Sequence, residues 1–355
     1  MANVQKQFQE FNDTIKIKRF EEEDTLREKR DIIKRRLDDK LPGVFKAHGE
    51  DCPSYHFLDQ GSYRMRTGVK PIDDGQYDID QGLYFQVETT GAYSDPVVLK
   101  ERVHEALVGH TEDVSIRKPC VTVFYRSNGE PIYHVDIAVY SHRDQHNDDN
   151  DRLARGTPGA KDENRIWEPS DQQGLVNKIE KKYTGSNWDQ FRRTVRALKR
   201  WKDENFRSVG HGAPRGIALT VAAYDDFSAK YSYTDPIAPK PDDLKALTSL
   251  VNAILARFQS TYDWEKQAAV RRIKITLPVA PKNDLCRRMT DNQMEAFEEK
   301  LKALRDALDA ADQDPDPVEA CKKLRKVFGE DFPVPEKNST GKSYGPAVVS
   351  SSSSA

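Results

Sequence analysis

The spacing of apolar residues changes along this chain, and that change limits the folds open to it. Between about Tyr55 and Tyr140 they alternate with polar residues, as in half-buried strands. After about residue 170 they recur every three or four residues, as in helices. Strands followed by helices, rather than alternating with them, are typical of an α+β fold. We therefore predict an α+β chain with a strand-rich part and a mainly helical part.

A long helix is predicted ahead of the strands, over about residues 5–41. Its apolar residues recur at roughly helical spacing, and Pro42 and Gly43 supply a stop signal. Because so long a helix needs a surface to lie on, we interpret it as a spine along one face of the domain. A coiled coil is the less favoured interpretation, since the apolar positions do not form regular heptads.

Three regions follow from these patterns. Residues 1–165 are predicted to form a core with its N-terminal helix, 166–337 a mainly helical lobe, and 338–355 a disordered Ser-rich tail. Further helices are predicted near 96–108, 171–183, 188–206, 217–227, 244–262 and 291–311. The polar segment 142–163 is predicted to be a surface loop or mobile flap. A small substrate would fit between the two main regions.

The composition of the chain limits the kinds of partner that it can bind. The chain has 56 Lys and Arg against 58 Asp and Glu, a net charge of -2, whereas proteins that wrap long nucleic acid usually carry a basic excess. No apolar run approaches the ~20 residues of a membrane helix, and the N-terminus lacks a signal-peptide pattern. We expect a cytoplasmic protein with neither a membrane nor a long nucleic-acid partner. The four cysteines are widely separated, which argues against zinc sites and disulfides.

Two aspartates stand two residues apart in the strand predicted over 77–87. Side chains with that spacing share a face, so Asp78 and Asp80 point together. Their carboxylates repel unless a cation such as Mg²⁺ lies between them. Asp136 lies in a second, apolar strand, where a carboxylate without a partner is costly to bury. If the two strands are neighbours, the three aspartates form a site for two divalent ions.

A Gly-Ser turn precedes the first aspartate pair. Gly61 lets the backbone approach a phosphate closely, and the Ser62 hydroxyl can donate to it. Gln60 stands directly before this turn, and Arg64 follows closely enough either to reach a nucleotide or to pair with Asp73 or Asp74. Each motif alone is common by chance, but their combination with a third aspartate is far more specific.

The helix predicted over 188–206 carries a basic face. Arg192, Arg196 and Lys199 share this face at helical spacing. Taken alone, such a face is usually solvated surface. Beside a triphosphate, Lys199 would neutralise the β- and γ-phosphates. His134 has the same strand parity as Asp136, but we interpret it as an ordinary strand histidine with satisfied hydrogen bonds.

Together these motifs resemble the polymerase-β-type nucleotidyltransferases. The resemblance rests on Gly61-Ser62, Asp78-Ile79-Asp80, Asp136 in HVDIAVY and Lys199 in LKRW. Within that superfamily the chain is most similar to the bacterial cGAS/DncV-like enzymes (CD-NTases) of CBASS anti-phage systems, through WEPSD at 167–171, LPVAPKNDLCRR at 277–288 and the segment 316–333. The resemblance implies a polymerase-β-like core, with a mixed sheet and a long N-terminal spine helix, plus a helical C-terminal lobe.

The resemblance also implies a mechanism. Asp78 and Asp80 would ligate two Mg²⁺ ions, with Mn²⁺ as a substitute, and Asp136 would complete the site that activates a 3′-hydroxyl. That hydroxyl attacks the α-phosphate of a second nucleoside triphosphate, ATP among them, and a later attack closes a cyclic di- or trinucleotide. The expected nucleotide contacts are Gln60, Gly61, Ser62, Arg64, Arg196, Lys199 and Asp284. Asp284 lies in a loop that approaches the base in relatives, with capping of its own loop as the alternative.

Two other functions stay open at this point. One is a template-independent transferase acting on RNA or on a protein hydroxyl, and the other is a non-catalytic scaffold with a decayed site. The expected partners are nucleoside triphosphates and CBASS operon proteins. The latter include a ubiquitin-transfer-like enzyme acting on the tail that ends at Ala355. Pro214-Arg215-Gly216 departs from many relatives, which have a serine or tyrosine near the phosphates.

Overall fold

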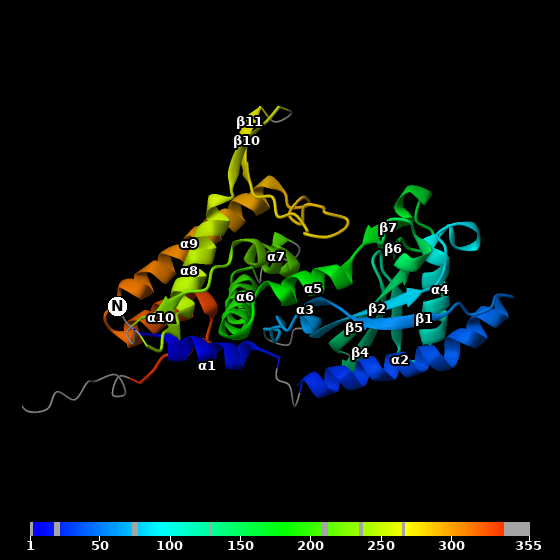
Figure 1. Cartoon of the computed structure of the whole chain (residues 1–355), viewed down its shortest axis with the longest axis horizontal. Coiled ribbons are helices and arrows are strands. Elements are labelled where there is room, and N and C mark those ends of the chain that lie inside the picture. The colour runs from blue at the N-terminus through cyan, green and yellow to red at the C-terminus, as the bar shows by residue number, and fades with distance from the viewer. Residues whose placement is uncertain are drawn as a thin grey trace, which may run out of the picture.

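A computed structural model describes residues 3–17, 22–72, 77–127, 130–206, 212–233, 237–264 and 267–336. This part of the chain has the α+β architecture that the spacing of apolar residues predicts, with a mixed sheet at one end and a group of helices at the other (Figure 1). The predicted tail lies outside the described residues. Asp73 and Asp74, the suggested partners of Arg64, also lie outside them.

The central sheet has seven strands in the described ranges, in the order β1-β2-β5-β4-β3, with β6 joined to β5 and β7 to β6. Their bounds are β1 Tyr55–Asp59, β2 Tyr77–Phe85, β3 Asp113–Ile116, β4 Val121–Ser127, β5 Glu130–Ser141, β6 Asp151–Arg155 and β7 Ile166–Ser170. Strands β4 and β5 pair antiparallel, and β2 pairs parallel with β5. The two strands that carry the acidic residues are therefore neighbours.

One face of this sheet is covered by α2 (Glu22–Ala47) and α4 (Pro96–Leu107) (Figure 1). Leu37 and Phe45 of α2 pack with Leu99 of α4 against the odd-numbered residues of β2 and β5, such as Leu83 and Ile137. Since side chains alternate between the two faces of a sheet, the even-numbered residues face the other way. The three aspartates are thus turned away from this core.

A second hydrophobic cluster holds the helical part together. It is built from α1 Gln5–Ile15, α5 Gln172–Lys182, α6 Gly185–Asn205, α7 Gly216–Asp226, α8 Asp243–Ala256, α9 Asp291–Gln313 and α10 Pro317–Phe328. Thr290 and Gln293 form a capping box at the start of α9. None of the helices in the described ranges is both long enough and apolar enough to span a bilayer. The predicted domain limits at residues 165 and 337 stay a prediction.

The shorter elements complete the description. A one-turn helix α3 Gly61–Arg64 links β1 to the site, and two small hairpins lie in the second half: β8 Tyr231–Ser232 with β9 Lys240–Pro241, and β10 Gln259–Asp263 with β11 Ala268–Arg272. Three 3-10 turns are η1 Gly91–Tyr93, η2 Arg143–Gln145 and η3 Asp162–Asn164.

The predicted single helix over 5–41 is wrong. The structure has two helices, of which α1 belongs to the helical cluster and α2 to the sheet cluster. Pro42 does not end the second helix but lies inside it. A proline within a helix costs about 3 kcal/mol, and burial of Leu41 and Phe45 against the sheet offsets this cost. The local stop signal was overridden by packing.

Two other predicted elements differ from the structure. Segment 142–163, expected to be a loop, contributes β6 to the sheet, and its Asp151 is 1% exposed beside Arg143. The ion pair lets the Asp151 carboxylate be buried, so β6 carries a charged residue where apolar spacing would require an apolar one. The helix predicted over 244–262 ends at Ala256 and gives way to β10. Helix α10 and the β10–β11 hairpin have no counterpart among the predicted elements.

Candidate active site

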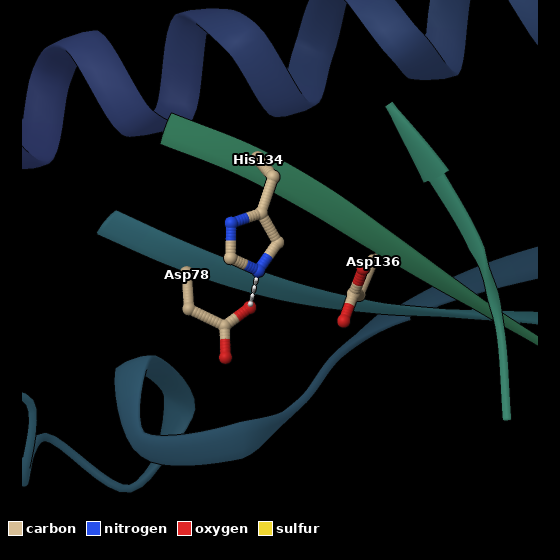
Figure 2. A group of neighbouring side chains, drawn as sticks. All are labelled: Asp78, His134 and Asp136. Carbon is tan, nitrogen blue, oxygen red and sulfur yellow. Dashed lines mark ion pairs between the residues drawn. The ribbon is translucent and has the colours of Figure 1, made fainter. Parts of the chain in front are cut away.

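The pairing of β2 with β5 brings the acidic residues together. In this parallel register Asp80 lies beside Asp136, and Asp78 lies beside His134. Ligating atoms of Asp78, His134 and Asp136 all lie within 4.8 Å of one another. Figure 2 shows these three side chains on the same side of the two strands. The sequence predicts that Asp78 and Asp80 share a face, and the structure adds the register that places the third aspartate next to them.

His134 takes a larger part in this cluster than its sequence interpretation suggests. Its Nε2 lies 3.2 Å from Oδ1 of Asp78 (Figure 2), and this contact raises the pKa of the imidazole. Its Nδ1 is buried and has no hydrogen-bond partner in the described part of the chain. The interpretation as a histidine with satisfied hydrogen bonds is therefore wrong. Its shared parity with Asp136 was the signal that could have identified it.

Asp136 is held by a residue that the sequence analysis missed. The hydroxyl of Thr122 donates to Oδ1 of Asp136 at 2.5 Å, because the β4–β5 register places these residues side by side. Thr122 is fully buried, so its hydroxyl fixes the orientation of the carboxylate. A count along the two strands from the Ser127–Glu130 pair would have pointed to Val121 instead, because the register shifts by one residue between Tyr125 and Arg126.

Asp80 lies under the Gly-Ser turn and carries unbalanced negative charge. Burial, together with the nearby carboxylates of Asp78 and Asp136, raises its pKa to about 7, although His134 and Lys199 act in the opposite direction. Oxygen donors that crowd together in this way are the ligands that hard divalent cations prefer. The three carboxylates therefore fit a divalent metal site.

Gln60 shapes the turn that covers Asp80. Its buried side chain donates to the Tyr84 hydroxyl at 2.6 Å and accepts from the Tyr140 hydroxyl at 3.2 Å. The two tyrosine rings stack with centroids 4.4 Å apart. The backbone N–H of Gln60 donates to the carbonyl oxygen of Asp80 at 3.1 Å. Gln60 thus acts as a support for the adjacent Gly61.

A cavity of 490 Å³ lies between the sheet and the helices. Seven of the predicted site residues line it: Gln60, Gly61, Ser62, Asp78, Asp80, Asp136 and Lys199. The amino group of Lys199 on α6 donates to the carbonyl and hydroxyl oxygens of Thr67, at 3.0 and 3.1 Å. Burial, together with the positive charge of Lys202 and Arg196, lowers the pKa of Lys199 to about 7. Lys202, one turn further along, also lines the cavity and was not predicted.

Three predicted contact residues do not line this cavity. Arg64 pairs with Glu180. The guanidinium of Arg196 donates to the Asn12 side chain at 2.8 Å, toward α1. Asp284 accepts from two backbone N–H groups of its own loop, at 3.1 and 2.9 Å, as the capping alternative describes. A role for these three in nucleotide binding stays a prediction.

Comparisons with known proteins agree with this geometry. Residues 55–140 match a family model described as "Cyclic GMP-AMP synthase DncV-like, nucleotidyltransferase domain". The apo form of Vibrio cholerae DncV superposes with a TM-score of 0.68 at 16% identity, over 93% of this chain and 96% of that chain.

Two further solved structures are similar in fold. DncV in complex with the linear intermediate 5′ pppA(3′,5′)pG gives a TM-score of 0.64 at 18% identity, covering 93% of this chain and 96% of that one. E. coli MS115-1 CdnC with ATP gives 0.61 at 20% identity, covering 92% and 98%. The resemblance to the CD-NTases is thereby confirmed, and residues 55–140 form a DncV-like nucleotidyltransferase domain within a chain that has the DncV fold.

Proposed function

We propose that this chain synthesises a cyclic di- or trinucleotide from nucleoside triphosphates, ATP among them. In each step a 3′-hydroxyl attacks an α-phosphate, the new phosphodiester bond forms, and pyrophosphate leaves. One observation carries the proposal: Asp78 and Asp80 of β2, Asp136 of β5 and Lys199 of α6 line the same 490 Å³ cavity. Carboxylates and an ammonium group around one such space suit a metal-bound triphosphate. A solved relative, DncV, is described as a cyclic AMP-GMP synthase.

Mg²⁺ is the ion we propose for this site, with Mn²⁺ as a substitute. Asp78, Asp80 and Asp136 would hold it. When bound, such an ion supplies activation of the hydroxyl and neutralisation of the phosphate charge.

The other contributions to the proposed reaction come from side chains of the protein. Thr122 keeps the Asp136 carboxylate oriented toward the cavity. Ser62 lines the cavity and can donate its hydroxyl to a phosphate oxygen. Lys199 and Lys202 supply positive charge where pyrophosphate leaves. Substrate binding favours the charged form of Lys199, since a nearby anion raises the pKa of an amine.

The biological setting is part of the proposal. The CD-NTase resemblance supports a cytoplasmic role in anti-phage signalling with CBASS operon proteins, including one that handles the C-terminal tail. A transferase acting on RNA is disfavoured by the net charge of -2. A decayed scaffold is disfavoured by the intact set of carboxylates in the cavity.

Product analysis tests the proposed function. The protein is incubated with labelled ATP, GTP, CTP and UTP and Mg²⁺, then with phosphatase, and the products are separated by chromatography and identified by mass spectrometry. A cyclic nucleotide has no terminal phosphate, so we expect a small, phosphatase-resistant product. Label found only on macromolecules would instead support the RNA or protein transferase.

Gly61→Ala is expected to reduce nucleotidyl transfer by about 10- to 100-fold. Gly61 has a φ of 67°, and an added Cβ would lie 1.7 Å from Oδ2 of Asp80, so that carboxylate must move. The rate is measured as pyrophosphate release. Gly91→Ala is the matched control, since Gly91 has a φ of 60° but no atom within 4 Å of the added carbon. Equal rates for both variants would contradict this account of the turn.

Asp80→Asn is expected to stabilise the fold in the presence of a chelator. The pKa of Asp80 is raised from 3.8 to about 7, so between these values the unfolded chain loses the proton while the folded chain keeps it. Ionisation of Asp80 therefore lowers the free energy of unfolding as pH rises through this window. The advantage of the variant should grow between about pH 4 and pH 7, to about 1–2 kcal/mol, and stay level above that range.

Denaturant unfolding at several pH values measures this difference. Mg²⁺ should reverse the order of stability, because it binds the ionised carboxylates of the wild type and stabilises the folded state. Asp306→Asn, at an exposed position on α9, serves as the control. An advantage of Asp80→Asn that shrinks as pH rises would show that the charge crowding described here is absent.

A further inference from the structure

A second cavity, of 240 Å³, lies where the end of α1, the first turns of α2 and the middle of α6 meet the turn that follows α3 (Figure 1). We call this cavity the turn pocket. Within the described ranges no carboxylate lines it, whereas five cations do: Lys16, Arg27, Arg66, Arg192 and Arg196. Cations gathered around a small space favour the binding of a compact anion.

The turn pocket adjoins the segment that carries Ser62. A Cβ added to Gly68, which lines the turn pocket, would lie 2.8 Å from Cδ1 of Ile17 and 3.7 Å from Oγ of Ser62. Gly68 thus lies between a residue of the turn pocket and a hydroxyl of the catalytic cavity. Helix α6 also contributes to both spaces, since Arg196 lines the turn pocket and Lys199 lines the catalytic cavity. A ligand in one space can therefore affect the other.

Arg196 carries a positive charge that its hydrogen bonds do not balance. Its guanidinium donates to the Asn12 side chain at 2.8 Å and to the carbonyl oxygen of Arg66 at 2.6 Å, and both acceptors are neutral. Its Nε is buried and has no hydrogen-bond partner in the described part of the chain. Burial, together with the positive charges of Arg192 and Arg193, lowers the pKa of this guanidinium to about 10. Since a buried charge without a counter-ion is costly, a bound anion would stabilise Arg196.

The carboxylates that act on Arg196 are engaged with other cations. Asp13 pairs with Lys16 at 2.5 Å, and Asp189 pairs with Arg192. The two aspartate side chains are 63% and 53% exposed, so solvent screens their effect on a buried guanidinium. Over the described ranges Arg196 itself forms no ion pair. The turn pocket therefore keeps an unmet need for negative charge.

The size and charge of the turn pocket indicate which anion fits it. Pockets for drug-sized ligands span about 300–1,000 Å³, so a cavity of 240 Å³ suits a group smaller than a nucleotide. Guanidinium groups pair with phosphate oxygens through two parallel N–H donors. Four arginines and one lysine line the turn pocket. Pyrophosphate, with its second phosphate group, balances more of this charge than orthophosphate does.

We propose that the turn pocket binds pyrophosphate, at a site separate from the catalytic cavity. The origin of this anion rests on the proposed function, because each step of that reaction releases pyrophosphate. The bound anion joins the guanidinium groups of Arg196 on α6 and Arg66 on the turn, and it thereby holds the segment that carries Ser62. Orthophosphate offers the same chemistry from a different source, so the two anions are compared.

Calorimetric titration with pyrophosphate, in the presence of a chelator, measures binding to the full chain. The variant is Arg66→Gln combined with Arg192→Gln, which leaves Arg196 in place. We expect the Kd for pyrophosphate to rise at least about tenfold, equivalent to one lost charged contact. Lys282→Gln combined with Arg35→Gln is the charge-matched control, since both residues are exposed and neither lines the turn pocket. Lys282 also shares the positive φ of Arg66, 55° against 53°.

Two further measurements separate the turn pocket from the catalytic cavity. Lys199→Met removes an ammonium group of the catalytic cavity and should leave the Kd for pyrophosphate unchanged. The backbone N–H of Thr67 donates to the carbonyl oxygen of Ser62 at 2.9 Å. Pyrophosphate should slow hydrogen exchange of this N–H in the wild type but not in the double arginine variant.

Each remaining outcome counts against the proposal in a different way. Binding that is lost in Lys199→Met but kept in the double arginine variant would place pyrophosphate in the catalytic cavity. No binding by the wild type, or the same Kd in every variant, would overturn the turn pocket as an anion site. Binding of 5′-phosphorylated RNA through these arginines, without binding of pyrophosphate, would assign the surface to nucleic acid.

Two results bear on the source of the anion. Orthophosphate that binds as tightly as pyrophosphate through the same arginines would overturn the reaction product as the ligand. None of the binding measurements depends on turnover. A protein that binds pyrophosphate in the turn pocket but makes no cyclic nucleotide would therefore refute the proposed function and leave the anion site standing.

Discussion

Asp136→Asn is expected to lower the rate of nucleotidyl transfer on the order of 10³-fold or more while leaving the fold intact. Asparagine has nearly the same shape, and its carbonyl oxygen can accept the hydrogen bond that Thr122 donates to Oδ1 at 2.5 Å. What the variant loses is the negative charge on the side of the cavity where the cation must bind. The loss should therefore fall on turnover and metal affinity rather than on stability.

Pyrophosphate release at saturating nucleotide and Mg²⁺ measures this effect, with thermal unfolding as the check on folding. Asp113→Asn is the matched control, since Asp113 belongs to β3 of the same sheet and pairs with Arg126 outside the cavity. A rate for Asp136→Asn within tenfold of wild type would remove Asp136 from the metal site. The proposed function would then lose its main support.

Lys199→Met is expected to lower turnover by about 10²- to 10³-fold, the usual cost of removing one preorganised charge at a reacting phosphate. Methionine keeps most of the length and the apolar stem of this cavity-lining side chain but lacks its ammonium group. The matched control is Lys178→Met, on the exposed face of α5.

The pKa of Lys199 adds a second readout. Burial and neighbouring cations lower it to about 7, so the free protein loses the Lys199 charge as pH rises through that value. Nucleoside triphosphate binding, measured with a chelator to remove metal effects, should weaken between about pH 6 and pH 8 in the wild type. Lys199→Met should bind more weakly at the lower pH and show a flatter profile. Identical profiles for both proteins would separate Lys199 from the triphosphate.

The candidate site was predicted best where strand geometry decides the outcome. Side chains two residues apart share a face of a strand, so the common direction of Asp78 and Asp80 follows from sequence alone. Their position next to Asp136 depends on the parallel β2–β5 register, which no local pattern encodes. The prediction had to assume that the two strands are neighbours, and the structure shows that they are.

The helical residues were predicted less well, for a physical reason. Helical spacing places Arg196 and Lys199 on one face, but it cannot say where that face points. In the structure Lys199 lines the cavity. Arg196 instead donates a hydrogen bond to Asn12 of α1, a residue 184 positions away in sequence. The stop signal at Pro42 failed for a related reason, because distant sheet residues stabilise the helix that continues through it.

The split of the N-terminal region into α1 and α2 has a consequence for how such an enzyme can diversify. The three aspartates of the cavity lie on strands that pack in one hydrophobic cluster, and Lys199 lies on a helix that packs in the other. Substitutions in the helical cluster can therefore reshape the space available to a base without disturbing the strand register that holds the aspartates. Base preference and bond-forming chemistry can in this way evolve almost separately within one short chain.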